Sequence, residues 1–200
     1  EDRAVTKQEA HNMSGLDGET FSEMGKLAVL GGWAVRVMVE KMGLKLWDLK
    51  WEFAKDGDDL VFVDTIDTDS FRATSVLEDG GDNIVIHYNK QAMRDYYKIS
   101  HSDWLGSINE AKEESRVTGV PFVELLRGRQ DSGDAPQDPK VNEDFMAIQV
   151  DKMNLIKDCI LGNREGSEVS GALADCGKRE VDFYTSNGQR DALKNLNGLG

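Results

Sequence analysis

An alternating stretch, LWDLKWEF at residues 46–53, constrains the fold of this chain more than any other. Apolar and charged residues alternate along it, and side chains two residues apart in a strand point to the same face. The pattern predicts a strand over residues 44–54 with Asp48, Lys50 and Glu52 on one face. Its two tryptophans are predicted to lie on the opposite face and to pack in the core. The charged face must meet water, a ligand or a metal, because isolated charges are costly to bury.

A turn signal, DGDD, follows this strand, and a second β-rich run, LVFVDTI, comes directly after the turn. Two such runs joined by a short Gly/Asp turn predict an antiparallel hairpin. If the turn occupies residues 55–59, Lys50 falls opposite Asp64. Glu52 is then the diagonal neighbour of Asp64, within reach of it across the strands.

Two carboxylates and an ammonium on one patch suit Mg²⁺, which takes one or two carboxylates together with phosphates and waters. The alternative is a solvated strand face with a cross-strand salt bridge, and the pattern alone favours this second reading. The segment continues as DTIDTDSFR, which adds Asp67, Asp69 and Arg72. An arginine at this place suits a phosphate, because its guanidinium can bind phosphate bidentately.

The rest of the chain is mostly helical in pattern, with one further strand. Apolar spacing and cap signals predict helices over residues 18–42, 89–98, 102–116, 120–127 and 142–161. A short strand is predicted over residues 84–87, and the polar, acidic segment 67–83 reads as a loop. Together these elements predict an α+β protein.

The domain organisation follows from one proline-rich segment. Residues 130–140 hold two of the three prolines among polar residues, which is typical of a linker. We therefore predict a first unit over residues 1–129 and a helical carboxy-terminal extension of unknown role over residues 141–200.

Composition excludes several classes of partner. The net charge of −13 disfavours non-specific binding to nucleic acid or to anionic membranes. No run approaches the roughly 18 apolar residues of a membrane span, and the pattern fits a cytoplasmic protein. Cys159 and Cys176 form no disulfide or zinc pattern and are predicted to be buried thiols.

The hairpin segment resembles that of SAICAR synthetase, a ligase of purine biosynthesis, whose pattern reads roughly "LVDxKxEFG…lvDEixpDsxR". The matching residues, all in register, are Asp48, Lys50, Glu52, Phe53, Asp64, Asp69 and Arg72. Downstream, YNKQAMRDYYK resembles the family's "xDKqxxRd" helix through Lys90, Arg94 and Asp95. Upstream, TKQEAHN resembles its "TkxexHD" segment, so the resemblance spans about residues 5–125.

This resemblance implies a reaction and its cofactors. ATP would activate the carboxylate of the aminoimidazole ribotide CAIR, and the amine of L-aspartate would then displace phosphate to give SAICAR. The resemblance implies that Glu52 and Asp64 bind Mg²⁺ and the ATP phosphates. Lys50 would lie among the phosphates and the substrate carboxylate, so that Lys50 and Asp64 are the expected catalytic residues.

The remaining matched positions imply a substrate pocket. Asp69 and Arg72 stand where the family contacts the amine and the phosphate of CAIR. Lys90 and Arg94 would line the same pocket. The fold implied is the carboxy-terminal lobe of SAICAR synthetase, an antiparallel sheet packed with helices, followed by the helical extension.

The chain also departs from the family pattern. Ala54 replaces a glycine, Thr65 an acid, and Asn12 the acid of a His-Asp pair. The family's ATP-covering amino-terminal lobe precedes the TkxexHD segment, which lies near the start of this sequence. We therefore expect a homo-oligomer or a partner chain to supply that lobe. The alternative is a catalytically incomplete or divergent relative that binds a partner or uses another carboxylate.

Overall fold

The computed structural model describes residues 3–199. The helices are α1 (Lys7–Ser14), α2 (Gly18–Lys41), α3 (Gln91–Ser100), α4 (Ser102–Thr118), α5 (Phe122–Ser132), α6 (Glu143–Ile160), α7 (Gly166–Ser186) and α8 (Arg190–Asn197). The strands are β1 (Lys45–Leu49), β2 (Phe53–Asp56), β3 (Asp59–Phe62), β4 (Phe71–Asp79), β5 (Asp82–His87) and β6 (Gly198–Leu199). The chain is α+β with antiparallel sheets, which confirms the predicted fold class.

The main sheet has the strand order β1-β4-β5-β6, with every neighbouring pair antiparallel. Its longest strand, β4, contradicts the loop predicted over residues 67–83. Phe71 and Ala73 on this strand are buried, whereas Arg72 is exposed. The segment reads as polar because one face of the strand meets water and because its acidic flanks form turns.

The single strand predicted over residues 44–54 is also wrong. β1 pairs with β4 and ends at Leu49, and β2 begins at Phe53 in a separate two-stranded sheet with β3. A bulge between Leu46 and Asp48 leaves the side chain of Trp47 outside the core, at 60% exposure. Its indole N–H instead donates to the Thr74 hydroxyl at 2.8 Å.

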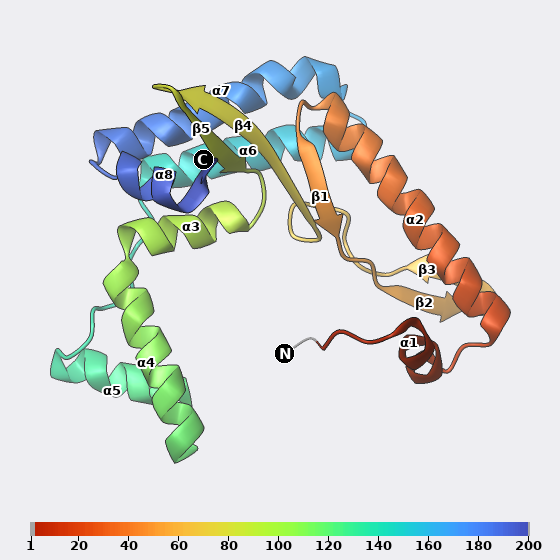
Figure 1. Cartoon of the computed structure of the whole chain (residues 1–200), viewed down its shortest axis with the longest axis horizontal. Helices are drawn as coiled ribbons and strands as arrows, with labels where there is room; N and C mark the ends of the chain where they lie inside the picture. The colour runs from red at the N-terminus through yellow and green to blue at the C-terminus, as the bar shows by residue number, and fades with distance from the viewer. Residues whose placement is uncertain (1–2, 200) are drawn as a thin grey trace.

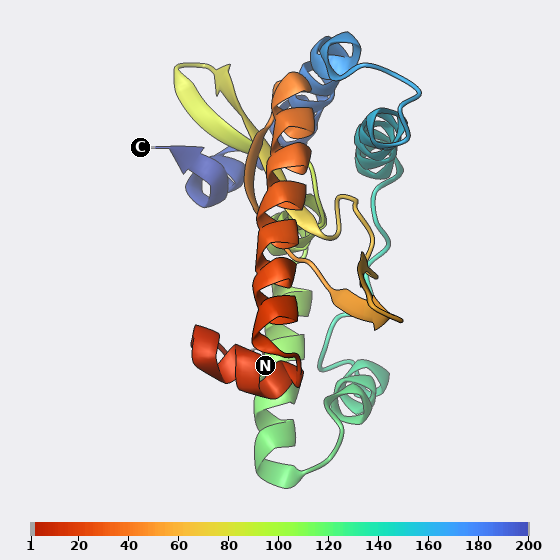
Figure 2. The same ribbon diagram turned by 90° about the vertical axis from the view of Figure 1, so that its right-hand side faces the viewer.

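The β2–β3 hairpin packs beside α2 (Figure 2). Gly57, at a positive φ of 63°, forms the turn, and Phe53 pairs with Phe62. The indole N–H of Trp51 donates to the carbonyl of Ala28 at 3.1 Å. Trp51 therefore packs at the edge of the core, as predicted, and joins the hairpin to the helix.

The five predicted helices are all present, with ends shifted by a few residues. Asn142, the first residue of the helix predicted over residues 142–161, caps α6, because its side chain accepts the backbone N–H of Asp144 at 2.9 Å. The Gly-, Ser- and Asn-rich remainder forms α7 and α8, so the predicted extension is helical. Both cysteines are free and buried, as predicted.

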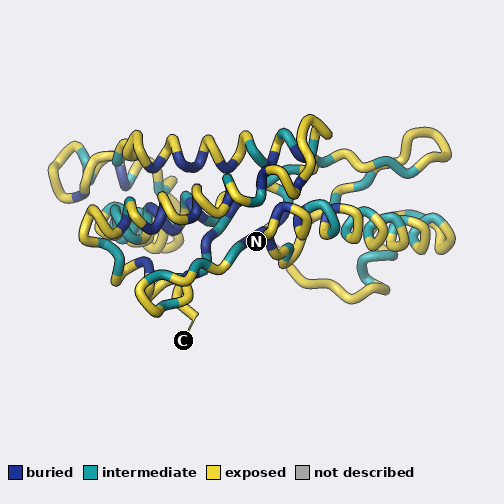
Figure 3. The backbone as a smooth tube through the Cα atoms, turned by 90° about the horizontal axis from the view of Figure 1, so that it is seen from above, coloured by how far each residue is buried: buried dark blue, intermediate teal, exposed yellow. Residues whose placement is uncertain are grey.

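One core cluster joins the sheet to the carboxy-terminal helices. α6 packs against α7, and α7 packs against β4 (Figure 1). Ile84 and Ile86 of β5 share this core with Phe145, Ile156, Val169 and Leu173. Buried positions concentrate in this part of the molecule, while the β2–β3 hairpin is mostly exposed (Figure 3). The division of the chain at residues 130–140 stays a prediction.

Candidate functional site

A cavity of about 700 Å³ lies where three segments far apart in the sequence meet. One is the loop 65–69 before β4, the second is the stretch 88–93 at the start of α3, and the third is the face of α6 between residues 149 and 161. The first two segments carry the motifs singled out in the sequence. The cavity is therefore the candidate binding site.

The loop before β4 is held by its own side chains. The carboxylate of Asp67 accepts the backbone N–H of Asp69 at 2.8 Å and that of Ser70 at 3.2 Å. The hydroxyl of Ser70 donates back to the Asp67 carbonyl at 3.0 Å. Short polar side chains bond their own backbone in this way at turns. The turn fixes the backbone on both sides of Asp69, which lines the cavity.

The start of α3 is tied to the start of β4. Asn89, which is buried, donates its side-chain amide to the Phe71 carbonyl at 3.3 Å and accepts the backbone N–H of Gln91 at 3.2 Å. Lys90 comes next in the chain, and its ammonium lies 3.4 Å from the carboxylate of Asp69. The structure therefore brings Asp69 and Lys90, two predicted substrate-binding residues, into one ion pair at the cavity.

Tyr88 lies between the cavity and the core. Burial raises the pKa of its phenol to about 12, so the group is neutral at pH 7. The hydroxyl donates to the carbonyl of Leu173 at 2.9 Å, which anchors this part of the cavity wall to α7.

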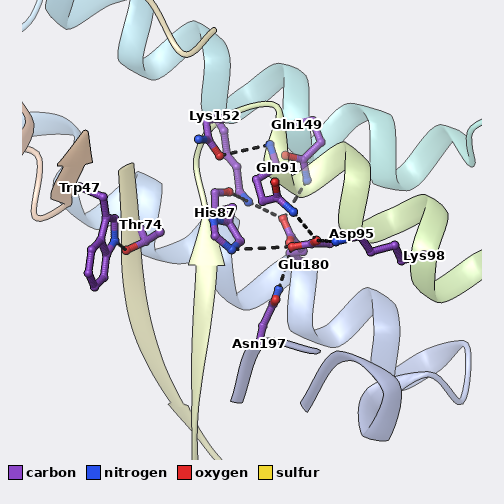
Figure 4. A network of polar contacts seen from close by, with 11 residues as sticks. Trp47, Thr74, His87, Gln91, Asp95, Lys98, Gln149, Lys152, Glu180 and Asn197 are labelled. Carbon is purple, nitrogen blue, oxygen red and sulfur yellow. Dashed lines mark hydrogen bonds and ion pairs between the residues drawn. The ribbon is translucent and has the colours of Figure 1, made fainter. Parts of the chain in front are cut away.

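Lys152 forms the polar floor of the cavity, and its side chain is 2% exposed. Its ammonium forms an ion pair with Glu180 of α7 and donates to the His87 carbonyl at 3.0 Å (Figure 4). Gln149 also donates to the Glu180 carboxylate, at 2.8 Å. The buried ammonium thus links α6 to α7 and to the end of β5.

Five of the seven predicted site residues lie outside the cavity lining, namely Lys50, Glu52, Asp64, Arg72 and Arg94. Arg72 forms an ion pair with Asp48 across β1 and β4, and its Nε lies 2.7 Å from Asp48 Oδ1. This hydrogen bond holds the pKa of Asp48 below its usual range. Arg94 is exposed on α3. Neither arginine is among the residues that line the cavity, so their roles in substrate binding stay predictions.

The predicted hairpin register is wrong by one residue. The backbone N–H of Val63 donates to the Glu52 carbonyl at 3.1 Å, so Glu52 faces Val63 and the ladder does not place Lys50 opposite Asp64. Lys50 forms an ion pair with Glu52 along the same segment, and Asp64 accepts the backbone N–H of Thr65 at 2.8 Å. The predicted register, which made Glu52 and Asp64 diagonal neighbours, is therefore not the one observed.

The fit of a magnesium ion to these residues follows from the same geometry. Carboxylates suit Mg²⁺, but within residues 3–199 no three His, Cys, Asp or Glu side chains gather into a metal-binding group. Glu52 and Asp64 are the two carboxylates that the family resemblance assigns to the ion. Their assignment as metal ligands stays a prediction that rests on the family resemblance.

The α6 wall of the cavity is what sequence reasoning missed. The apolar spacing that predicts this helix does not show that Met153, with 56% of its side chain exposed, lines the cavity. Asn154 and Lys157 line it as well. Helical spacing shows which residues share this face, but only tertiary packing shows that the face meets the loop before β4.

A family model of SAICAR synthetase matches residues 1–111, which is more than half of the chain. The chain therefore belongs to the SAICAR synthetase family. No curated protein and no solved structure matches it. The matched region contains Asp69 and Lys90 and ends before α6.

Membership supports a ligase-type role in purine biosynthesis for this chain. The family generally uses ATP and Mg²⁺. Among residues 3–199, no helix is both long and apolar enough to cross a membrane.

Proposed function

We propose that this chain is an ATP-dependent carboxylate–amine ligase that joins CAIR to L-aspartate and gives SAICAR. The observation that carries the proposal is the Asp69–Lys90 ion pair at 3.4 Å, formed by two family motifs at one cavity. A cavity of about 700 Å³ is of the size that holds small-molecule ligands.

The proposed reaction has two steps. A carboxylate oxygen of CAIR attacks the γ-phosphorus of ATP, so that an acyl phosphate forms and ADP leaves. The amine nitrogen of L-aspartate then attacks the acyl carbon, loses a proton and expels phosphate. Neither step requires a nucleophile from the protein, and catalysis of this kind rests on positioning and on charge stabilisation.

The residues at the cavity suit the binding of such a substrate. Lys90 supplies a positive charge for an anionic group, and Asp69 supplies an acceptor for an amine. Because the two are already paired with each other, a substrate that carries both an anion and an amine can replace the pair. Its anion then binds the ammonium of Lys90, and its amine N–H donates to the carboxylate of Asp69. The loop around Asp67 holds Asp69 in place before the substrate arrives.

The direct test is an assay with ATP, Mg²⁺, CAIR and L-aspartate, on the chain alone and with any co-encoded partner chain. We expect ADP release that depends on both CAIR and aspartate. Asp69→Asn and Lys90→Met should each reduce kcat/KM for CAIR by at least about tenfold, which corresponds to about 1.4 kcal/mol. Asp58→Asn and Lys178→Met are matched controls, because both residues are exposed and lie outside the cavity lining.

No ADP release, with or without a partner, would refute the ligase proposal. A second candidate is the same phosphate chemistry on a different carboxylate. It is favoured by the wall that α6 contributes to the cavity, which lies beyond the family match. ADP release with another carboxylate, and none with CAIR, would establish that candidate instead.

A further inference from the structure

The rim of the cavity carries apolar side chains that are not buried in the core. Ile66, Met153 and Leu161 line it, and their side chains are 41%, 56% and 65% exposed. Ile66 belongs to the loop before β4, Met153 lies on α6, and Leu161 directly follows that helix. Exposed apolar side chains that surround a concave site are typical of ligand contact.

The lysines that line the cavity differ in how closely a carboxylate pairs with each of them. Lys90 is matched by Asp69 at 3.4 Å, and Lys152 is matched by the buried carboxylate of Glu180. Lys157 lies on the α6 wall with 57% of its side chain exposed, and its ammonium lies 4.0 Å from a carboxylate oxygen of Asp158.

The position of the Lys157 ammonium is set by a neutral neighbour. Its Nζ donates to the side-chain oxygen of Asn154, one turn earlier, at 3.1 Å. Among the described lysines that line the cavity, Lys157 therefore has the weakest carboxylate partner. An anionic group that enters the cavity meets an ammonium already held on this wall, at little cost in side-chain ordering.

We propose that α6 is the specificity-determining wall of this site. Met153 packs against a heteroaromatic ring, and Lys157, held by Asn154, pairs with an anionic group on that ring or on its phosphorylated sugar. The flexible thioether of methionine suits a flat ring, because it adapts its shape and contacts aromatic edges favourably. The inference rests on the proposed function for the class of substrate, and it assigns a role to a helix outside residues 1–111.

The test measures binding separately from turnover. The probes are the ribotide CAIR, which carries both the ring carboxylate and the phosphate, and ATP with Mg²⁺, each titrated by calorimetry. Lys157→Gln should weaken ribotide binding by about tenfold, and Met153→Ala by about fivefold. Neither variant should change the affinity for ATP. Lys157→Arg should bind ribotide within about threefold of wild type, because it keeps the charge.

The control is Lys178→Gln on α7, an exposed lysine outside the cavity, which should bind ribotide like the wild type. Because Lys157 and Met153 are exposed, urea unfolding should show unchanged stability in both variants.

The outcomes separate this inference from the ligase proposal. One outcome is that the wild-type protein binds ribotide, that Lys157→Gln binds it more weakly, and that the wild-type protein releases no ADP in the ligase assay. This outcome supports the α6 wall and refutes the ligase proposal. Active wild-type protein whose Lys157→Gln and Met153→Ala variants bind ribotide normally overturns the α6 wall alone. Wild-type protein that does not bind the ribotide at all overturns the α6 wall as well.

Discussion

Lys152 and Glu180 form an ion pair between α6 and α7 whose side chains are only 2% and 4% exposed. The same ammonium donates to the carbonyl of His87 at 3.0 Å and lies 4.7 Å from the centre of the Tyr88 ring. One lysine thus links the carboxy-terminal helices to the end of β5, directly before the residues that build the cavity.

Lys152→Met should reduce the free energy of unfolding by about 3–5 kcal/mol, because it leaves the carboxylate of Glu180 buried without its cation. Urea denaturation measures the loss. The double variant Lys152→Met/Glu180→Leu should be more stable than Lys152→Met, since it removes the unmatched charge. Lys178→Met, at an exposed site on α7, should change stability by less than about 0.5 kcal/mol. Additive losses in the double variant would contradict the pairing.

His87 should make stability depend on pH near neutrality. Burial lowers the pKa of its ring, against the opposing charge of Asp95, whose carboxylate lies 3.7 Å from Nε2. The folded state therefore binds the proton less well than the unfolded state, whose pKa is about 6.5. The contribution to stability is present above about pH 6.5 and is lost as the pH falls through the folded pKa.

His87→Gln should lack this part of the slope. Urea unfolding of the variant and the wild type at a series of pH values between 7.5 and 5 measures it. Equal slopes in His87→Gln and wild type would show that the ring does not titrate in this way.

Two glycines of α2 should respond differently to alanine. A Cβ at Gly31 would lie 3.1 Å from Phe62 and 3.2 Å from Trp51, whereas one at Gly25 would meet nothing within 4 Å. Gly25→Ala should raise the free energy of unfolding by about 0.5–1 kcal/mol, because alanine is the better helix former. Gly31→Ala should be at least about 0.5 kcal/mol less favourable, since the hairpin rings must shift. Equal thermal stability of the two variants would show that the hairpin does not pack on α2 as described.

The Asp48–Arg72 pair should matter little at neutral pH and not at all in acid. Its side chains are 49% and 62% exposed, so Arg72→Met should cost up to about 1 kcal/mol. Because Arg72 lowers the pKa of Asp48, the contribution is present above the unfolded pKa of about 3.9 and is lost as the pH falls through the folded pKa. Denaturant unfolding at pH 7 and near pH 2.5 tests this. An equal loss at both values would mean that Arg72 stabilises the sheet by packing alone.

Helices were the part of this chain that could be predicted best. Their apolar spacing and caps are local, so Asn142 and the stripe that follows it were sufficient to place α6. The strand pairing was not local. Only the first half of LWDLKWEF pairs with β4, and the backbone N–H of Lys50, which donates to the Ser70 carbonyl at 2.8 Å, continues that register by one residue. The second half pairs with β3 instead.

The sequence by itself determined the family, the α+β class and the motif residues Asp69 and Lys90. These rest on residue identity and spacing, which need no knowledge of what packs against what. Only the tertiary structure decided that Asp69 and Lys90 meet at a cavity and that α6 forms its remaining wall. The physical reason is that cavities and registers depend on contacts between distant segments, and alternation along one strand does not specify its partner.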